Sequence, residues 1–327
     1  MRVPPWLALV LLGVLLVAAS WWRLEVGPSP DDAAVAAQVL SIRKGHLVSG
    51  LLVGASLALA GVLLQGLLRN PLASPDIMGL ASGAGLAVML AGYIGYRLGT
   101  DVLGGGRPLG PAVFGSFAAL ALVYLLSQRR GVIDPVSMVL VGVIVSITAT
   151  AGTMLIQQLM PDRGLHTARW LFGGLDEEAG TPRRVACAGI LLIVGGWAMV
   201  RSRVFDAAMM SADEARSVGI RLGRVRAFQF VGSGVLTGGA VALAGPVGFV
   251  GLVAPHLARG LVGPRHAWSQ PASMLIGALL VVAADASIRV FEVASGRLPL
   301  GVLTALLGGP FFLTLLVGGK GRGGHLR

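Results

Sequence analysis

Few residues of this chain have the types and spacings that catalysis or metal binding requires. Its five histidines are scattered and form no HExxH motif: His46, His166, His256, His266 and His325. The single cysteine, Cys187, excludes a CxxC pair and an intrachain disulfide. Lys44 and Lys320 are the only lysines, and neither completes a GxxxxGK[ST] phosphate-binding loop. We therefore expect neither a metal site nor a nucleotide site here, so ATP hydrolysis would belong to a separate subunit.

Two pairs of reactive side chains lie within apolar runs. Ser82, in the glycine-rich string GLASG, could form an intramembrane protease dyad with His256. The string is not GxSxG and no acidic partner is apparent, so we interpret Ser82 as a small packing residue. Asp285 and Arg289 stand four residues apart, which predicts a neutralising pair on one helix face. Arg289 lies nearer the outer end of that helix, where it could reach outward and contact a partner.

The clearest local signal is a capping box in a basic loop. Ser211 and Glu214 have the spacing in which each side chain binds the backbone amide of the other residue. Asp213 and Glu214 also favour the positive end of the helix dipole, and Gly219 lies where a helix-ending glycine is common. The pattern predicts a short helix at about 211–219. With methionines beside it, this helix is a candidate docking element.

Composition indicates which elements must position these residues. The chain has 327 residues, of which 55% are hydrophobic and 13% charged, and its mean hydropathy is +0.80. An ordinary soluble domain is roughly 25% charged. Uncharged stretches approach or exceed the roughly 20 residues that a membrane-crossing helix needs. The net charge of +11 is then interpreted as membrane-flanking anchors rather than as a nucleic-acid surface.

The sequence predicts an all-α polytopic membrane protein that forms one domain, 1–327, with about ten spans. The first run could be a signal peptide, but the many spans behind it favour a retained helix. Gly245 and Pro246 interrupt the long run 227–258 and divide it into two helices. The predicted spans are 6–22, 47–68, 77–96, 109–127, 136–160, 184–201, 225–243, 247–262, 271–291 and 300–318. Lys and Arg slightly favour an orientation with both termini in the cytoplasm.

Glycine spacing and a short sequence echo suggest how the spans pack. Small residues four apart, such as Gly50 with Gly54 and Gly79 with Gly83, let helices approach closely. The strings ALAGVLLQGLLRNP and ALAGPVGFVGLVAP would run in opposite directions, as an inverted repeat does in transporters, although chance similarity is an alternative. The candidate helix-break or packing positions in the two strings are Gly61, Asn70, Pro71, Gly245, Pro246 and Pro255.

Four stretches resemble the FecCD-type permeases of bacterial ABC importers for ferric siderophores, haem and cobalamin. They are GASLALAGVLLQGLLRNPLASPDIMGLASGAGL at 54–86, MSADEARSVGI at 210–220, GPVGFVGLVAPHLARGLVGPRHAWSQPAS at 245–273 and LPLGVLTALLGGPFFLTLL at 298–316. The resemblance implies the type II importer permease fold in the bacterial inner membrane. It also implies a second permease copy or close paralogue, two ATP-binding subunits and a periplasmic or lipoprotein substrate-binding protein.

The resemblance also assigns roles to individual residues. It implies that the capped helix couples to the ATPase through Ser211, Asp213, Glu214, Ala215, Arg216 and Gly219. Arg43 and Arg289 match arginines that contact carboxylates on the binding protein. His46 stands where a second arginine of the outer motif is usual, and Arg297 replaces an acidic residue of the family. His46 could make its contact sensitive to pH.

The function that follows is a translocation path without enzymatic activity. No cofactor is expected in this chain, because ATP and Mg²⁺ would bind the partner ATPase. An iron–siderophore complex is the first expected substrate, with haem and cobalamin as alternatives within the family. A secondary transporter driven by protons or sodium is the alternative from another class, and it would require an acidic residue within the membrane, for which Asp285 is the candidate.

Overall fold

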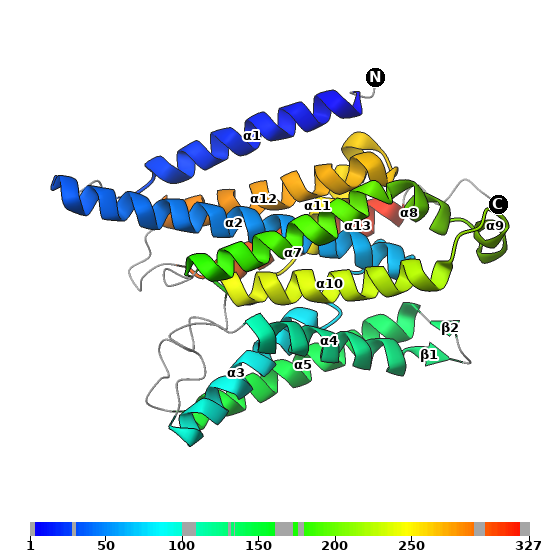
Figure 1. The fold of residues 1–327 in the computed structure, drawn as a ribbon, viewed down its shortest axis with the longest axis horizontal. Helices are drawn as coiled ribbons and strands as arrows, with labels where there is room; N and C mark the ends of the chain where they lie inside the picture. Colours follow the sequence, from blue (N-terminus) through cyan, green and yellow to red (C-terminus); the bar gives the residue numbers. More distant parts are fainter. Residues whose placement is uncertain are drawn as a thin grey trace.

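The computed structural model describes residues 4–27, 31–99, 109–129, 132–133, 135–160, 173–175, 180–290 and 298–320. Helices dominate these ranges, which confirms the all-α fold class (Figure 1). The helices are α1 Pro5–Glu25, α2 Ala33–Leu68, α3 Leu80–Leu98, α4 Leu109–Leu126, α5 Pro135–Gln158, α7 Thr181–Val200, α8 Ser202–Ala208, α9 Ala212–Ser217, α10 Leu222–Ala244, α11 Val250–Val262, α12 His266–Val290 and α13 Leu300–Lys320. A two-residue antiparallel ladder joins β1 (Gln128–Arg129) to β2 (Val132–Ile133).

Seven of the described helices are long and apolar enough to cross a bilayer: α1, α2, α4, α5, α7, α10 and α12. Helices α3, α11 and α13 lie at the other three predicted spans. Helix α11 has only 13 residues, so by itself it covers about 20 Å at 1.5 Å per residue. It is therefore shorter than the hydrocarbon core of a bilayer, which is about 30 Å thick.

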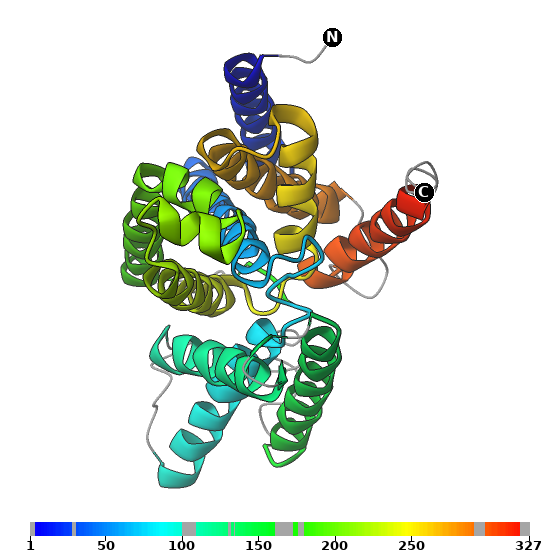
Figure 2. The same ribbon diagram turned by 90° about the vertical axis from the view of Figure 1, so that its right-hand side faces the viewer.

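Helix α2 is the central element of the bundle. Seen along the bundle in Figure 2, it is surrounded by α12 and α11 on one side and by α7 and α10 on another. It begins at Ala33, well before the predicted span 47–68, because the side chain of Asp32 caps it. Asp32 Oδ1 accepts hydrogen bonds from the amides of Ala34, at 2.7 Å, and Val35, at 3.4 Å.

Glycines allow α2 to contact its neighbours through the backbone. A Cβ atom added to Gly54 would lie 2.7 Å from Cα of Ala278 in α12 and would overlap the carbonyl of Gly277. A Cβ added to Gly61 would likewise overlap the carbonyl of Gly251 in α11. Between α3 and α4, Gly83 and Gly115 face each other in the same way. Helices packed this closely leave no room for a methyl group, so these positions require glycine.

A second group of helices, α3, α4 and α5, lies to one side of this central bundle (Figures 1 and 2). Helix α3 packs against both α4 and α5, and α10 joins the group to the rest through its contact with α4. Helix α13 lies at another side and contacts α12 and α11.

The long run 227–258 is divided between two helices. Helix α10 ends at Ala244, Gly245 has φ +67°, and α11 begins at Val250. Pro255, proposed from the sequence as a break or packing position, lies buried inside α11 and does not break it. The two ALAG strings have different structures, because the first lies within the uninterrupted α2 and the second ends at the break. The inverted repeat inferred from them therefore stays a prediction.

Helices α8 and α9 lie at one end of the bundle, which we call the α9 end. Figure 1 shows that α1 begins and α13 finishes toward this same end. Helices α2 and α12 extend through the bundle to the opposite end, where α1 also ends. The α9 end and the opposite end each carry a polar site.

Candidate functional site

The short helix α9 begins with the predicted capping box. The Ser211 amide donates to Glu214 Oε2 at 3.0 Å, and the Ser211 hydroxyl donates to the same oxygen at 2.7 Å. The Glu214 amide donates to Ser211 Oγ at 3.3 Å. These bonds satisfy backbone donors that the first turn of a helix would otherwise leave open.

The same hydrogen bonds affect the ionisation of Glu214. The side chain of Ser211, followed by its backbone amide, lowers the pKa of the Glu214 carboxyl below its ordinary value of 4.5. Glu214 is therefore ionised near neutral pH, where it also favours the positive end of the helix dipole. The position and charge of this carboxylate come from a local motif on an exposed helix.

Helix α9 ends as the sequence predicted, at a glycine. Gly219 has φ +79°, and the amide of Ile220 donates to the Ala215 carbonyl at 2.9 Å, which is the Schellman arrangement. Ala215 is fully buried, whereas Val218 is 60% exposed. Asp213 is exposed as well, and the side chain of Arg216 lies outside the described residues. The helix is thus fixed at both termini and presents one side to solvent.

A carboxylate joins α8 to the first residue of α12. Asp206 Oδ1 accepts a hydrogen bond from the His266 amide at 2.9 Å and lies 2.6 Å from His266 Nδ1. His266 opens α12, so its amide is one of the donors without a partner inside the helix. The Asp206 charge also lies at the positive end of the α12 dipole. The two residues are 60 positions apart in the sequence.

An arginine joins the end of α2 to the same segment. Arg69 Nη2 donates to the carbonyl of Ala208, the last residue of α8, at 3.1 Å and to that of Met210, between α8 and α9, at 2.9 Å. Arg69 caps α2 in the left-handed region, with φ 47°. For a residue other than glycine this backbone conformation costs about 1–3 kcal/mol. The two hydrogen bonds hold the guanidinium against residues 202–219, the segment that contains α8 and α9.

An apolar contact completes the attachment of the segment that contains α8 and α9. Phe205 of α8 is 1% exposed, and its ring lies 6.1 Å from that of Trp197 in α7 and 6.1 Å from that of Phe228 in α10. Trp197 and Phe228 stack on each other with centroids 3.7 Å apart. The ring of His266 lies 5.7 Å from Phe205 on another side. Helix α8 is therefore seated on α7 and α10 by aromatic rings.

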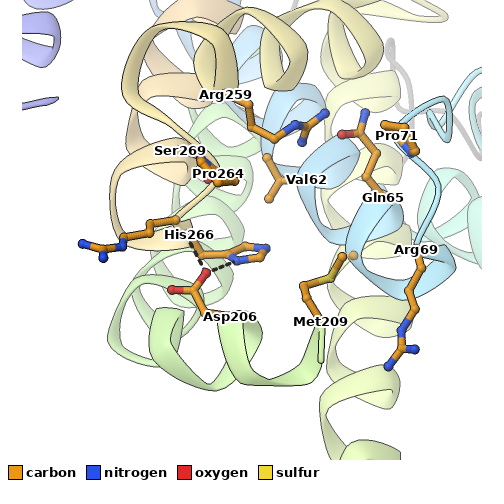
Figure 3. A pocket seen from close by; sticks show the side chains of 12 residues that line it. Val62, Gln65, Arg69, Pro71, Asp206, Met209, Arg259, Pro264, His266 and Ser269 are labelled. Carbon is orange, nitrogen blue, oxygen red and sulfur yellow. Dashed lines mark hydrogen bonds and ion pairs between the residues drawn. The ribbon is translucent and has the colours of Figure 1, made fainter. Parts of the chain in front are cut away.

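A pocket of about 450 Å³ lies between the two polar attachments (Figure 3). Asp206, Met209 and His266 line one side of it, and α2 supplies Gln65 and Arg69. Figure 3 shows the Arg259 side chain extending from α11 toward Gln65. Among the described residues, Arg259 Nη2 and Gln65 Oε1 are buried without a hydrogen-bond partner. The pocket thus separates α8 from the end of α2 in the space between the Asp206–His266 contact and the Arg69 contact.

A buried charge cluster lies toward the opposite end, between α1, α2 and α12. Arg23 of α1 is fully buried, and its Nε contacts Asp285 Oδ2 at short range. Arg289 Nε lies 3.5 Å from the same oxygen, as the four-residue spacing predicted. His46 Nδ1 lies 3.2 Å from Arg23 Nη2 and in short contact with Arg289 Nη2. Because both arginines donate, His46 Nδ1 acts as the acceptor.

The cluster changes how the expected docking residues are placed. We expected Arg289 to reach outward, but its side chain is 14% exposed and turns inward to Asp285 and His46, because the buried carboxylate attracts it. His46 is only 2% exposed. Arg43 is half-buried and donates to the Leu24 carbonyl at 2.7 Å. Their docking role stays a prediction, and Arg297 lies outside the described residues.

A further polar contact supports the break between α10 and α11. Phe249 caps α11 with φ 65°, and its amide donates to Asp76 Oδ2 at 2.7 Å. The Asp76 carbonyl accepts from the Ser146 hydroxyl at 3.1 Å. Asp76 therefore ties the α2–α3 connection to α11 and α5. Near it, Asn70 Oδ1 accepts from the Leu72 amide at 2.9 Å, while the adjacent Pro71 is exposed.

Several of these residues were not identified from the sequence: Arg23, Arg69, Asp76 and Asp206. Each is a charged residue at the edge of an apolar run, where a membrane anchor is the ordinary interpretation. Of these four residues, only Asp76 had a local sequence signal, the Pro75–Asp76 dipeptide between two predicted spans. All four act through partners far away in the sequence, so no spacing rule could find those partners. Ser82 and His256, the possible protease dyad, share no hydrogen bond in the described part of the chain.

The class of protein follows from these observations. Apolar helices long enough to cross a membrane surround a central helix, and a short capped helix is attached at one end, as in a multi-pass membrane transport permease. Residues 5–318 match the FecCD transport family. The chain therefore belongs to the FecCD transport family.

Named relatives agree with this assignment. The chain is 35% identical over 326 residues to the ferric enterobactin transport system permease protein FepD of Escherichia coli, covering 95% of each chain. It is 33% identical to the hemin transport system permease protein HmuU of Yersinia pestis, covering 85% of this chain and 82% of that protein. A metal-chelate type ABC transporter solved in an inward-facing conformation matches with TM-score 0.78 and 28% identity, over 95% of this chain and 98% of that one.

Proposed function

We propose that this chain is the membrane-spanning permease subunit of a binding-protein-dependent ABC importer. The observation that carries the proposal is α9, a helix capped at both termini and exposed on one side at the end of the bundle. In this proposal α9 is the coupling helix that contacts a separate ATPase, and Ser211, Asp213, Glu214, Ala215, Arg216 and Gly219 form or stabilise that contact. ATP and Mg²⁺ bind the ATPase and not this chain.

The assembly that we propose contains two permease copies, or this chain with a close paralogue, and two ATP-binding subunits. A periplasmic or lipoprotein binding protein delivers the substrate at the end opposite α9. Arg43 is the best-placed docking residue, because it is half-buried beside the end of α1 while His46 and Arg289 are turned inward. Both termini then lie in the cytoplasm of a bacterial cell, on the α9 side of the inner membrane.

A glycine pair tests the coupling assignment. Gly219 has φ +79° and nothing within 4 Å of an added Cβ, so Gly219→Val should disturb only the backbone that ends α9. We expect this variant to insert in the membrane but to co-purify with less ATPase. Gly223→Val is the matched control, since Gly223 is also uncrowded but has no positive φ. Equal ATPase recovery from both variants would count against the coupling role of α9.

We propose an iron–siderophore complex as the substrate, with haem and cobalamin as the alternatives. The proposal rests on the kinship with the enterobactin permease, and the binding protein supplies most of the recognition. Uptake of labelled ferric siderophore, haem and cobalamin should be compared in cells that express the whole system. Saturable siderophore uptake that stops on ATP depletion is expected. If only haem or only cobalamin is taken up, that compound replaces the iron–siderophore complex as the proposed substrate.

Ion-driven transport is less well supported by the geometry. Such a transporter needs an acidic side chain within the membrane that can take up the coupling ion. Asp285 was the candidate, and it contacts the guanidinium groups of Arg23 and Arg289. A carboxylate that already has two guanidinium groups as partners is compensated by fixed charges of the chain and does not need a mobile ion beside it.

A further inference from the structure

We propose that Asp206 and Arg69 are positioning residues that transmit movement of α9 to helices α12 and α2. This inference rests on the proposed function, because it takes α9 as the element that the ATPase moves. The chain itself connects the coupling segment, residues 202–219, only to α7, through Arg201, and to α10, through residues 220–221. Helices α2 and α12 are distant in sequence and need contacts made through space.

Asp206 provides the connection to α12. Its Oδ1 atom is shared by the His266 amide and the His266 ring, at 2.9 and 2.6 Å. A single oxygen with two donors on one residue fixes both the direction and the distance between α8 and the first turn of α12. The His266 side chain is 12% exposed and that of Asp206 is 37% exposed, so water reaches the carboxylate and the contact acts through its geometry more than through burial.

Arg69 provides the connection to α2. Its Nη2 atom bonds two carbonyls that lie on either side of Met209, between the end of α8 and the start of α9. Arg69 is also the residue that ends α2, so its backbone and side chain link that helix directly to the coupling segment. The two hydrogen bonds hold the Arg69 side chain in place and so support the left-handed backbone conformation of this residue.

The two contacts reach helices whose movement would pass to the rest of the bundle. Helix α2 is central in the bundle, and it packs closely against α12 through Gly54 and Gly277. The pocket of about 450 Å³ lies between the contacts, so there the coupling segment is not packed solidly against α2. Side-chain packing cannot transmit a displacement across the pocket, but the polar contacts on either side of the pocket can.

The test uses the complete transporter, with this chain, the ATPase and the binding protein, in proteoliposomes. Asp206→Ala removes the acceptor for His266. Arg69→Asn removes the guanidinium but keeps a residue that tolerates the left-handed region. Arg203→Ala is the control, because Arg203 is an exposed arginine of the same α8. ATP hydrolysis, ATPase co-purification and substrate imported per ATP are measured for each.

We expect Asp206→Ala and Arg69→Asn to assemble and to hydrolyse ATP near the wild-type rate. Import per ATP should fall roughly tenfold, within the range of coupling between protein sites. Asp206→Asn keeps an acceptor oxygen and should recover part of the loss, and Arg203→Ala should behave as wild type. A purely structural role would reduce assembly, hydrolysis and import together and would not lower import per ATP.

Unchanged import per ATP in assembled Asp206→Ala and Arg69→Asn complexes would overturn the inference while leaving the proposed function intact. If Asp206→Ala fails to assemble, Asp206→Asn is used instead, because it preserves the size of the side chain. Import per ATP should still fall in Asp206→Asn, by less than tenfold, and an unchanged ratio would overturn the inference. Failure of the wild-type chain to co-purify with any ATPase would instead overturn the proposed function and this inference with it.

Discussion

At the scale of single residues, the cluster around Asp285 shows how the bundle accommodates charge. Arg23 is fully buried, and its guanidinium contacts the carboxylate of Asp285. Removing one partner of a buried pair leaves the other charge without compensation, and that costs more than the pair contributed. The pair is therefore a point at which small chemical changes should have large effects on stability.

Asp285→Asn should lower the free energy of unfolding by about 3–5 kcal/mol, the range for breaking a buried ion pair. The physical reason is that the Arg23 guanidinium keeps its charge and loses its counter-ion. The midpoint of thermal unfolding in detergent measures the effect. The double variant Arg23→Leu, Asp285→Leu should recover part of the loss, since it removes both charges. Equal midpoints for Asp285→Asn and wild type would contradict the prediction.

The capping box gives a pH dependence whose sign is fixed by Glu214. Its pKa is lower in the folded chain, so the stability it adds to α9 is present at neutral pH and is lost as the pH falls through that lowered pKa. Amide hydrogen exchange in α9, corrected for intrinsic rates, should therefore accelerate as the pH falls below the ordinary glutamate pKa of 4.5. Glu214→Gln keeps the capping geometry without titrating, so its exchange should vary less with pH. The same pH dependence in both proteins would reject the assignment.

At the scale of elements, the sequence predicted what is encoded locally. The capping box, Gly219 and the break at Gly245 each act within a few residues, and the structure has the corresponding bonds and dihedral angles. Helix α2 begins before the predicted span 47–68, because hydropathy marks the part of a helix that can lie in the membrane and not the whole helix. Asp32 was a usable signal for that start, as a capping residue.

The contacts that join elements could not be predicted in this way. Arg23 and Asp285 are 262 positions apart in the sequence, and Arg69 and Met210 are 141 positions apart. Charged residues beside spans are common as anchors, so their presence does not identify a partner. The resemblance to a family predicts a coupling role for the helix at 211–219 but says nothing of the residues that attach this helix to α2 and α12.

Close packing of α2 against α12 yields a prediction about glycine. Gly54→Ala would place a methyl group against the backbone of Gly277 and Ala278, so we expect destabilisation of about 1–3 kcal/mol or more from overpacking. Gly13→Ala in α1 is the control, because nothing lies within 4 Å of its added Cβ. Alanine there should be neutral or slightly stabilising in a helix. Thermal unfolding of both variants in detergent checks the difference, and equal midpoints would refute it.

At the scale of the whole molecule, the two ends of the bundle can be distinguished experimentally. Helix α9 lies at one end, beside Arg201, Arg203 and Arg221, and α3 extends to the other end (Figure 1). Basic residues beside spans favour the cytoplasmic side. Val218 is 60% exposed at the α9 end and Leu98 is 69% exposed at the end of α3, so both sites accept a label.

Single cysteines at these two positions test the proposed orientation. The native Cys187 is 3% exposed, so it should contribute little background labelling. In intact cells with a permeable outer envelope, a membrane-impermeant maleimide should label Leu98→Cys and leave Val218→Cys unlabelled until the inner membrane is opened. Labelling in the reverse order would place α9 outside, beyond reach of any cytoplasmic ATPase. The coupling role of α9 would then fail together with the orientation, because ATP is available only on the cytoplasmic side.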